Sequence, residues 1–486
     1  MLRRIVALLA CVALASSAAP ARKPNVLLIV ADDLGYAELS CQGSRDLRTP
    51  NIDSLARFGV RFTSGYVSAP VCCPSRAGLL TGRYQTRFGH EHNAIGLQNL
   101  EPGIGLPREE KTLADLLRAE GYAAGLVGKW HLGATKPFHP RHRGFDEFYG
   151  FLHEGHFYAP PPYDGMVSWF RVRSLPEGAV GPRWRQDNLI FSTHMGNTEP
   201  MYDRENPILR GFDEAGPEHE YLTDALGREA EAFIRRHAAE PWFLYLAYNA
   251  PHSPLQATRD WFDRMVAIAD VQRRIFAAMV GSLDESVGRV LGALRTLGLE
   301  ENTLVVFFSD NGGPTRELTS SNRPLRGGKG SLYEGGIRVP FLIQWKGRVP
   351  AGVVYDLPVI SLDVAPTALA AAGARIPENL DGVDLVPFLR GDRAGAPHET
   401  LYWRYGDRYA LRQARWKLVR NGAAVELYNL RADMGEQRDL AADNAAAAKR
   451  LQAEWEHRNA EMTEPRWRSK GSGAVDNWPL EFVRKR

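Results

Sequence analysis

A cysteine pair stands where a strand-like segment passes into a helix-like one, in the segment 71–83, which reads V-C-C-P-S-R-A-G-L-L-T-G-R. Cys72 at this turn would lie at the positive end of a helix dipole and four residues before Arg76. Both features favour nucleophilic chemistry at sulfur, because they stabilise negative charge there. The segment therefore predicts a reactive group at the start of a helix.

Four side chains with hard ligand atoms follow two apolar segments, as the pairs Asp32-Asp33 and Asp310-Asn311. Either pair alone could simply cap a turn, the usual role of such residues after a strand. Together they supply four oxygen ligands, which suit Ca²⁺ or Mg²⁺ rather than zinc. The sequence therefore predicts a divalent cation between two strand ends.

Two lysines and two histidines stand in short motifs that could bind an anion. Lys129 and His131 lie in Gly-Lys-Trp-His-Leu-Gly, and His252 lies in Ala-Pro-His-Ser-Pro. Lys329 lies in the glycine-rich stretch 325–340. A single lysine is usually a solvated charge and a single histidine a satisfied polar residue. The stretch around Lys329, however, is too long and too specific to explain as a structural loop.

Four short apolar segments each end in one of these polar clusters. They are the segments 25–30, 122–127, 242–248 and 303–308. A run that is apolar on both faces suits a central strand of a parallel sheet. Open α/β sheets bind ligands at the carboxyl ends of their strands, so we expect the clusters to converge on one site.

Helical periodicity lies between the apolar segments, at 113–119, 221–237, 271–297 and 361–372. This alternation predicts an α/β fold, a large doubly wound and mostly parallel sheet flanked by helices. The segment 133–217 is rich in Pro, Gly and aromatic residues and has little periodicity. It predicts long loops over the site, where substrate contacts would lie.

The sequence changes character near 391–397. Beyond it come three short strand-like runs and a helical run, at 408–413, 416–420, 425–430 and 445–462. They predict a small C-terminal antiparallel sheet with a helix. We therefore expect a catalytic α/β domain over residues 22–395 and a C-terminal α+β subdomain over 396–486.

The first 21 residues predict a secretory signal, with Arg3 and Arg4 as its basic start and Ala19-Pro20-Ala21 as its cleavage site. No later stretch reaches the ~20 apolar residues of a membrane span. We expect an exported, periplasmic or extracellular enzyme. The formal net charge is +3, of which these two arginines supply two. So small a charge argues against a nucleic-acid partner.

Four cysteines are present, and Cys11 lies within the predicted signal. A lipid anchor at Cys11 is disfavoured, because almost no apolar run precedes it. Modification of Cys72 would leave Cys41 and Cys73, too few for a disulfide-stapled scaffold. These two could form a bridge in an oxidising compartment, but two buried free thiols are the favoured alternative.

The pattern C-x-P-S-R-x-x-L-x-T-G-R over 72–83 resembles the signature of the sulfatase family, the formylglycine-dependent type I sulfatases of the alkaline phosphatase superfamily. Only Cys72 has proline two places on and arginine four places on, since Cys73 would need proline where Ser75 stands. The resemblance implies that a maturation enzyme converts Cys72 to formylglycine. It runs from Lys23 to about residue 440, with a small departure at Met434.

The resemblance implies a Ca²⁺ cofactor, with Mg²⁺ as the alternative. Its ligands would be Asp32, Asp33, Asp310, Asn311 and the modified Cys72. The implied catalytic residues are Cys72, Arg76, Lys129, His131, His252 and Lys329. In this mechanism a formylglycine gem-diol attacks sulfur and Asp310 accepts its proton. The leaving alcohol takes a proton from His252, either alone or together with Lys329. His131 then triggers release of sulfate.

Substrate contacts are expected from Lys129, His252, Lys329 and His156. The segment 150–156 departs from many relatives at His153 and Glu154. The implied function is a sulfuric ester hydrolase of arylsulfatase type. The aromatic residues of 157–184 favour a sulfated carbohydrate over a small aryl or alkyl sulfate. The oligomeric state is left open.

Two other functions compete with sulfate ester hydrolysis. A phosphonate monoester or phosphodiester hydrolase of the same superfamily would use the same fold and metal. A non-catalytic carbohydrate-binding relative is disfavoured, because no catalytic position is missing. The complete signature at 72–83 and the paired lysines favour sulfate.

Overall fold

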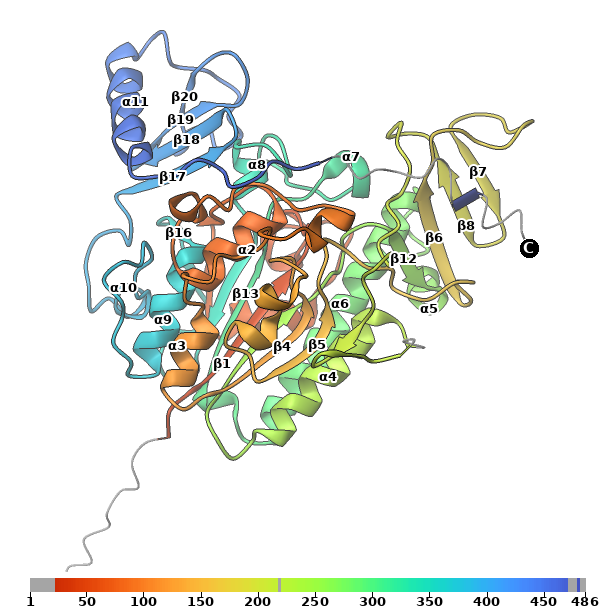
Figure 1. Cartoon of the computed structure of the whole chain (residues 1–486). Helices are drawn as coiled ribbons and strands as arrows, with labels where there is room; N and C mark the ends of the chain where they lie inside the picture. Colours follow the sequence, from red (N-terminus) through yellow and green to blue (C-terminus); the bar gives the residue numbers. More distant parts are fainter. Residues whose placement is uncertain (1–21, 217–219, 471–478, 481–486) are drawn as a thin grey trace, which may run out of the picture.

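The computed structural model describes residues 22–216, 220–470 and 479–480, so the predicted signal and Cys11 lie outside the described residues. A ten-stranded sheet forms the centre of the molecule (Figure 1). In spatial order its strands are β10 (Asp213–Glu214), β9 (Leu209–Arg210), β5 (Glu147–Phe151), β4 (Ala123–Lys129), β11 (Trp242–Ala247), β1 (Asn25–Ala31), β13 (Thr303–Ser309), β14 (Phe341–Gln344), β2 (Val60–Phe62) and β15 (Val353–Tyr355).

The five strands β5-β4-β11-β1-β13 are all parallel and neighbour one another. Four of them are the predicted apolar segments, each within one residue at either end except that β4 reaches Lys129, two residues further. Antiparallel pairs join β14 to β13 and β9 to β5. The sheet is therefore mostly parallel, as predicted, with antiparallel strands outside its central block.

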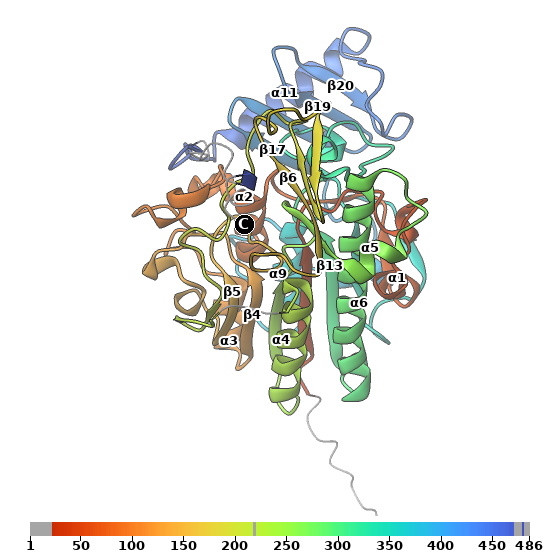
Figure 2. The same cartoon turned by 90° about the vertical axis from the view of Figure 1, so that its right-hand side faces the viewer.

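Helices cover both faces of the sheet. One face packs on α1 (Pro50–Arg57), α4 (Leu222–Arg236) and α6 (Val271–Thr296), and the other on α2 (Cys72–Thr81), α3 (Leu113–Ala119) and α9 (Val364–Ala371). Along β1, Ile29 enters the first core and Leu28 the second, as a doubly covered strand requires. Figure 2 shows α4 and α6 side by side. The predicted doubly wound architecture is confirmed.

The segment 133–217 is not simply the run of loops predicted from its composition. It contributes β5, β9 and β10 to the main sheet and three strands to a second, four-stranded sheet (Figure 1). In spatial order that sheet is β12 (Leu255–Thr258), β6 (Met166–Arg171), β8 (Leu189–Ser192) and β7 (Arg183–Gln186). Its strands are short, and β6 pairs with β12, far away in sequence, so no local periodicity reveals it.

The C-terminal region forms the predicted small antiparallel sheet. Its strands are β17 (Thr400–Tyr405), β18 (Arg408–Gln413), β19 (Trp416–Arg420) and β20 (Glu426–Asn429), and α11 (Ala445–Asn459) packs on it. The sequence analysis missed β17. This sheet shares a core with Tyr66 and Tyr84 of the large domain, through Trp403 among others. Figures 1 and 2 show it over the end of the main sheet at which α2 begins.

The remaining elements are short and mostly connect the layers. They are β3 (Gly65–Tyr66), β16 (Val359–Ile360), α5 (Arg259–Arg264), α7 (Thr315–Leu318), α8 (Glu334–Ile337) and α10 (Val386–Arg390). Among the helices within the described ranges, none is both long and apolar enough for a membrane span.

Candidate active site

The polar residues that follow four adjacent parallel strands meet at one end of the sheet, as predicted. Asp32 and Asp33 follow β1, and Asp310 follows β13. Cys72 opens α2 beside them. Ligand atoms of these four buried residues all lie within 4.8 Å of one another. The fold thus gathers the predicted nucleophile and three carboxylates at a single point.

The two adjacent cysteines have different surroundings. Cys72 Sγ donates a hydrogen bond to Asp32 Oδ1 at 3.5 Å, whereas Cys73 Sγ lies 2.8 Å from His90 Nε2. Cys41, Cys72 and Cys73 are all free thiols, so the bridge weighed from the sequence is absent from the described residues. Only Cys72 faces the carboxylate cluster.

The Cys72 thiol is not activated as it stands. Burial raises its pKa well above the usual range, although the charges of Lys129 and Lys329 oppose the rise. The expectation that the helix dipole and Arg76 would favour a thiolate is therefore wrong for the unmodified side chain. A protonated buried thiol is a poor nucleophile.

Three cations, the buried Lys129 and Arg76 and the partly buried Lys329, face the three carboxylates. The pairs are Lys129 Nζ with Asp32 Oδ2 at 2.5 Å, Lys329 Nζ with Asp33 Oδ2 at 2.8 Å, and Arg76 Nη2 with Asp310 Oδ2 at 2.8 Å. Lys129 ends β4, and Arg76 follows Cys72 by one helical turn. Tyr245, which the sequence analysis missed, accepts a hydrogen bond from Arg76 Nη1 at 3.1 Å. Charges of both signs are thus balanced in this cluster.

Crowding of like charges is visible in the acidity of the carboxyl groups. Burial raises the pKa of Asp310 to about 6, and the charge of Asp32 adds to the rise. Burial also raises the pKa of Asp33, which Lys329 opposes. Burial acts in the same direction on Asp32, but the surrounding positive charges, Lys129 first, together outweigh it and hold that pKa far below the usual range. A bound cation would relieve this repulsion.

Asn311 completes a donor set that fits a hard divalent cation. Its Nδ2 donates to Asp33 Oδ1 at 2.6 Å. Its Oδ1 is buried and has no hydrogen-bond partner among the described residues. Buried oxygens rarely lack a partner, so this orphan atom beside three carboxylates supports a metal ligand.

The two predicted histidines differ in which ring nitrogen is free of a hydrogen bond. His252 Nδ1 lies 2.7 Å from Ser253 O, which leaves Nε2 free, 3.6 Å from Asp33 Oδ2. His131 Nε2 lies 2.9 Å from Ala94 O, and its buried Nδ1 has no partner in the described part of the chain. Each ring therefore offers one lone pair, if the carbonyl-bound nitrogen carries the proton.

Both rings are neutral at physiological pH. Burial lowers the pKa of His252 to about 4, despite the charge of Asp32, and lowers that of His131 well below its usual range. The Lys329 ammonium stays protonated, because nearby charges, Asp33 first, outweigh the effect of burial and raise its pKa. Near His252, Lys329 is thus the group that holds a proton.

Two of the site residues adopt backbone conformations that L-amino acids rarely take. Asp33 has φ 67° and His131 has φ 57°. A left-handed conformation costs about 1–2 kcal/mol for such residues. Strain of this kind persists where the surroundings over-determine it, which is typical of functional sites.

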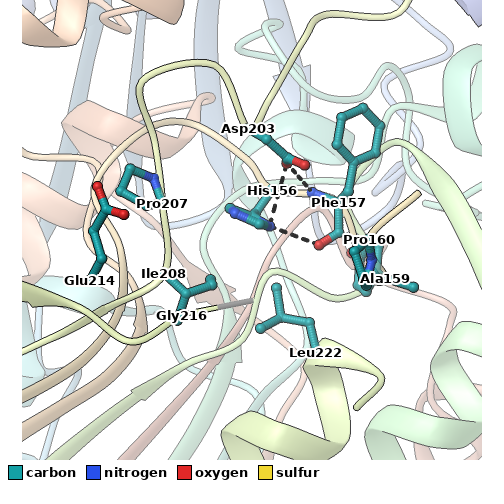
Figure 3. Close-up of a pocket in the computed structure, with 11 residues that line it drawn as sticks. His156, Phe157, Ala159, Pro160, Asp203, Pro207, Ile208, Glu214, Gly216 and Leu222 are labelled. Atoms are coloured by element: carbon teal, nitrogen blue, oxygen red, sulfur yellow. Dashed lines mark hydrogen bonds and ion pairs between the residues drawn. The ribbon is translucent and has the colours of Figure 1, made fainter. Parts of the chain in front are cut away.

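His156 lies apart from the cluster. It lines a cavity of about 270 Å³. Figure 3 shows Ile208 and Leu222 among the other lining residues. The Nδ1 of His156 lies 2.8 Å from Phe157 O and 3.5 Å from Asp203 Oδ1. Within the described residues, its side chain makes no hydrogen bond or ion pair with the carboxylate cluster. A substrate contact by His156 therefore remains a prediction.

The unusual residues at 153 and 154 are both buried. Glu154 accepts hydrogen bonds from Gly96 N at 2.7 Å and Asn99 Nδ2 at 2.9 Å. It therefore anchors a neighbouring turn. His153 Nε2 is buried without a partner in the described chain.

The sequence analysis also missed a buried network behind His252. Glu317 Oε1 lies 2.7 Å from Arg171 Nη1 and accepts from Ser253 Oγ at 2.9 Å. The Tyr202 hydroxyl lies 2.8 Å from Ser253 Oγ, and its ring packs edge-on against His252 at 5.8 Å. These residues come from separate elements, so no local sequence motif predicts that they meet.

Comparisons with known proteins agree with this geometry. The sequence profile of the family described as Sulfatase matches residues 24–374, and that of "N-sulphoglucosamine sulphohydrolase, C-terminal" matches 328–464. Mouse steryl-sulfatase is 36% identical over 474 residues, covering 87% of this chain and 74% of that protein. Dog N-acetylgalactosamine-6-sulfatase is 36% identical, covering 80% and 70%.

Solved structures show the same relationship. The crystal structure of Ps i-CgsB has a TM-score of 0.81 and 37% identity, covering 95% of this chain and 98% of that one. A second structure of that protein is described as a complex with k-i-k-neocarrahexaose. With this geometry and these relatives, the chain belongs to the sulfatase family and is a sulfatase, an enzyme that hydrolyses sulfate esters.

Proposed function

We propose that this sulfatase removes sulfate from a sulfated carbohydrate, with formylglycine made from Cys72 as its nucleophile and a divalent cation, Ca²⁺ or Mg²⁺, as its cofactor. The observation that carries the proposal is the position of Cys72, whose Sγ lies within 4.8 Å of three carboxylates. Its buried, protonated thiol would serve chemistry poorly without conversion.

The cation would be held by Asp32, Asp33, Asp310, Asn311 and the group at position 72. When bound, it would draw in the negative sulfate ester and stabilise charge that develops at sulfur. The three paired cations already balance the three carboxylates. A divalent ion would therefore leave the site positive, as an anionic substrate requires.

Formylglycine, once hydrated, supplies one hydroxyl to attack sulfur and a second whose deprotonation expels sulfate. Arg76, Lys129 and Lys329 bind the sulfate oxygens with charges that are already in place. Asp310, which lies within 4.8 Å of residue 72, accepts the proton of the attacking hydroxyl. The free Nδ1 of His131 accepts the second proton.

The leaving alcohol receives its proton from the pair of Lys329 and His252. Lys329 holds the proton in the resting site, since the pKa of His252 is lowered to about 4, chiefly by burial. The free Nε2 of His252 then orients and relays it. This refines the sequence-based assignment, which placed His252 first.

A carbohydrate substrate is supported by the structure of Ps i-CgsB with k-i-k-neocarrahexaose and by the N-acetylgalactosamine-6-sulfatase relative. Export is supported by the signal-like segment 1–21. An exported enzyme would meet its maturation enzyme before it folds, since residue 72 is buried in the fold.

The test combines mass spectrometry with sulfate release. The chain is produced with and without a formylglycine-generating enzyme, and the tryptic peptide 62–76 is examined. We expect modification at Cys72, unmodified Cys73, and sulfate release from sulfated glycans and 4-nitrophenyl sulfate. Cys72→Ala should abolish turnover, whereas Cys73→Ser should retain most of it. Full activity with an unmodified Cys72, or faster turnover of aryl phosphonate than aryl sulfate, would contradict the proposal.

A further inference from the structure

The segment 91–94 lies directly against the reaction centre. Asn93 Oδ1 accepts a hydrogen bond from Cys73 N at 3.0 Å. The carbonyl of Ala94 lies 2.9 Å from His131 Nε2. The segment 91–94 therefore forms one layer of chain over Cys72 and His131. A residue that packs on its other side is separated from them by this layer alone.

The C-terminal region supplies that outer layer. The Tyr405 ring lies 5.4 Å from the His92 ring, and Gly406 N donates to Glu91 Oε1 at 2.7 Å. Further along, Trp467 Nε1 donates to His92 O at 3.1 Å. The turn between β17 and β18 and the tail after α11 thus both rest on 91–94.

The same turn also reaches the loop that carries Lys329. The Arg408 guanidinium lies 4.5 Å over the Tyr405 ring and donates to the carbonyl of Gly330. The pKa of Tyr405 is raised by burial, with the charges of Lys329 and Cys72 also acting on it. No hydrogen-bond partner of the Tyr405 hydroxyl is found among the described residues. The turn between β17 and β18 thus borders both the segment 91–94 and the loop that carries Lys329.

Two arginines make this edge positive. No carboxylate pairs with Arg408 or with the exposed Arg468 in the part of the chain that the structure describes. By contrast, Arg404 is neutralised by Glu91 at 2.7 Å. The pKa of His92 is lowered mainly by burial, and Arg468 and Arg408 lower it further. Trp467 and Ser469, the neighbours of Arg468, donate to the carbonyls of His92 and Asn93 at 3.1 Å and 2.6 Å. Arg408 stacks on Tyr405, whose ring contacts His92, so both arginines lie beside the segment 91–94.

We propose that Tyr405, Arg408 and Arg468 form a subsite for the leaving group, which binds a second anionic substituent on the glycan. The inference rests on the proposed function and narrows its substrate to carbohydrates that carry a further sulfate or a carboxylate beside the sulfate removed. Tyr405 contacts the sugar ring and its hydroxyls, and the two arginines bind the anion. Through this subsite, the C-terminal region would bind part of the substrate.

The experiment compares kcat/KM on four probes: 4-nitrophenyl sulfate, a monosulfated disaccharide, its disulfated form, and a monosulfated disaccharide that contains a uronate. The wild-type enzyme should prefer the doubly charged disaccharides, and added salt should weaken the preference. Which of the two is preferred identifies the anion. Arg408→Gln and Arg468→Gln should each reduce that preference about tenfold, the worth of one charged hydrogen bond. Tyr405→Phe should lower kcat/KM on disaccharides more than on the aryl sulfate.

Arg431→Gln is the matched control, an exposed arginine of the same subdomain, and should leave the preference unchanged. A preference that survives both arginine substitutions, or equal losses on all four probes, would overturn the subsite. So would a wild-type enzyme that prefers the monosulfated disaccharide. Absence of sulfate release from every probe, the aryl sulfate included, would instead overturn the proposed function and this subsite with it.

Discussion

At the scale of single residues, the two histidines of the site differ in the ring nitrogen they leave free. His252 presents Nε2 beside Lys329's partner Asp33, whereas His131 presents a buried Nδ1. If His252 serves the leaving group, His252→Ala should show a rate deficit that shrinks as the leaving-group pKa falls. If His131 serves sulfate release, His131→Ala should give an initial burst of alcohol and then stall.

Stopped-flow and steady-state rates over a series of aryl and alkyl sulfates measure both effects. The wild-type enzyme is the reference for each ester. Equal losses on every ester in both variants, with no burst, would show that these roles are assigned wrongly.

The orphan oxygen of Asn311 and the crowded carboxylates predict a cation that stabilises the fold. After chelation, added Ca²⁺ should raise the melting temperature, because a ligand that binds only the folded state stabilises it, by about 2.7 kcal/mol at a hundred times its Kd. Asp310→Asn should lose most of this shift. Asp443→Asn, an exposed carboxylate elsewhere, should keep it. A Mg²⁺ titration alongside distinguishes the two ions. A melting temperature indifferent to both ions would refute the cation site.

At the scale of elements, the short helix α7 holds the turn that presents His252. Glu317 joins Arg171 and Ser253 through a single oxygen, and Ser253 in turn contacts Tyr202. Glu317→Ala leaves Arg171 with less compensation and frees Ser253. We expect a roughly 10–100-fold loss of kcat, the usual effect of residues that orient a catalytic group.

A change in kcat with little change in KM would distinguish positioning from binding. Glu317→Gln should recover part of the rate, since it can still accept from Ser253. Arg316→Gln on the same helix is the control, because Arg316 contacts only His194 O among the described residues. If Glu317→Ala lowers the melting temperature but not kcat, the network is structural.

Elements with local signals were predictable from the sequence. The helix over 113–119 has the predicted bounds. It begins at a capping box formed by Thr112 and Asp115, which is a local signal in the sequence. The central strands were predictable because both of their faces are buried. By contrast, β6 takes its register from β12, so the second sheet depends on pairing between distant segments.

The site residues also fall into those that local segments predict and those that depend on contacts between distant segments. Asp32, Cys72, Lys129 and Asp310 stand at the ends of elements that the sequence predicts, so their convergence followed from the topology of a parallel sheet. Tyr405 comes to the site only through the docking of the C-terminal sheet. No spacing within its own segment could show that contact.

At the scale of the whole molecule, a buried ion cluster joins the C-terminal sheet to the large domain. The domain boundary at residue 395 remains a prediction. Lys417 Nζ of β19 lies 2.9 Å from Glu334 Oε1 and 2.8 Å from Glu436 Oε1, and all three side chains are fully buried. Tyr66 of β3 donates to Glu334 Oε2 at 2.6 Å. Lys417 thus pairs with two carboxylates across the junction, and Arg338 Nη1 also pairs with Glu334 Oε2, at 3.1 Å.

The two carboxyl groups respond to pH in opposite ways. Burial raises the pKa of Glu436 to about 7, above its usual 4.5, so its contribution to stability is present at low pH and is lost as pH rises from 4.5 through 7. Although burial alone would raise the pKa of Glu334, the charges of Lys417, Arg338 and Arg412 together hold it at about 2. Its contribution is present above pH 4.5 and is lost as pH falls toward 2.

Lys417→Met should therefore destabilise the protein by about 3–5 kcal/mol, since it leaves the buried Glu436 without its cation and Glu334 with Arg338 alone. The loss, measured by thermal unfolding, should grow between pH 5 and pH 8 as both groups are forced to ionise. Adding Glu436→Gln should restore part of the stability at pH 8, because one unpaired charge is then gone. Lys449→Met, an exposed lysine of α11, should change stability by less than about 0.5 kcal/mol. A deficit that is the same at both pH values would show that packing, rather than charge, holds this junction together.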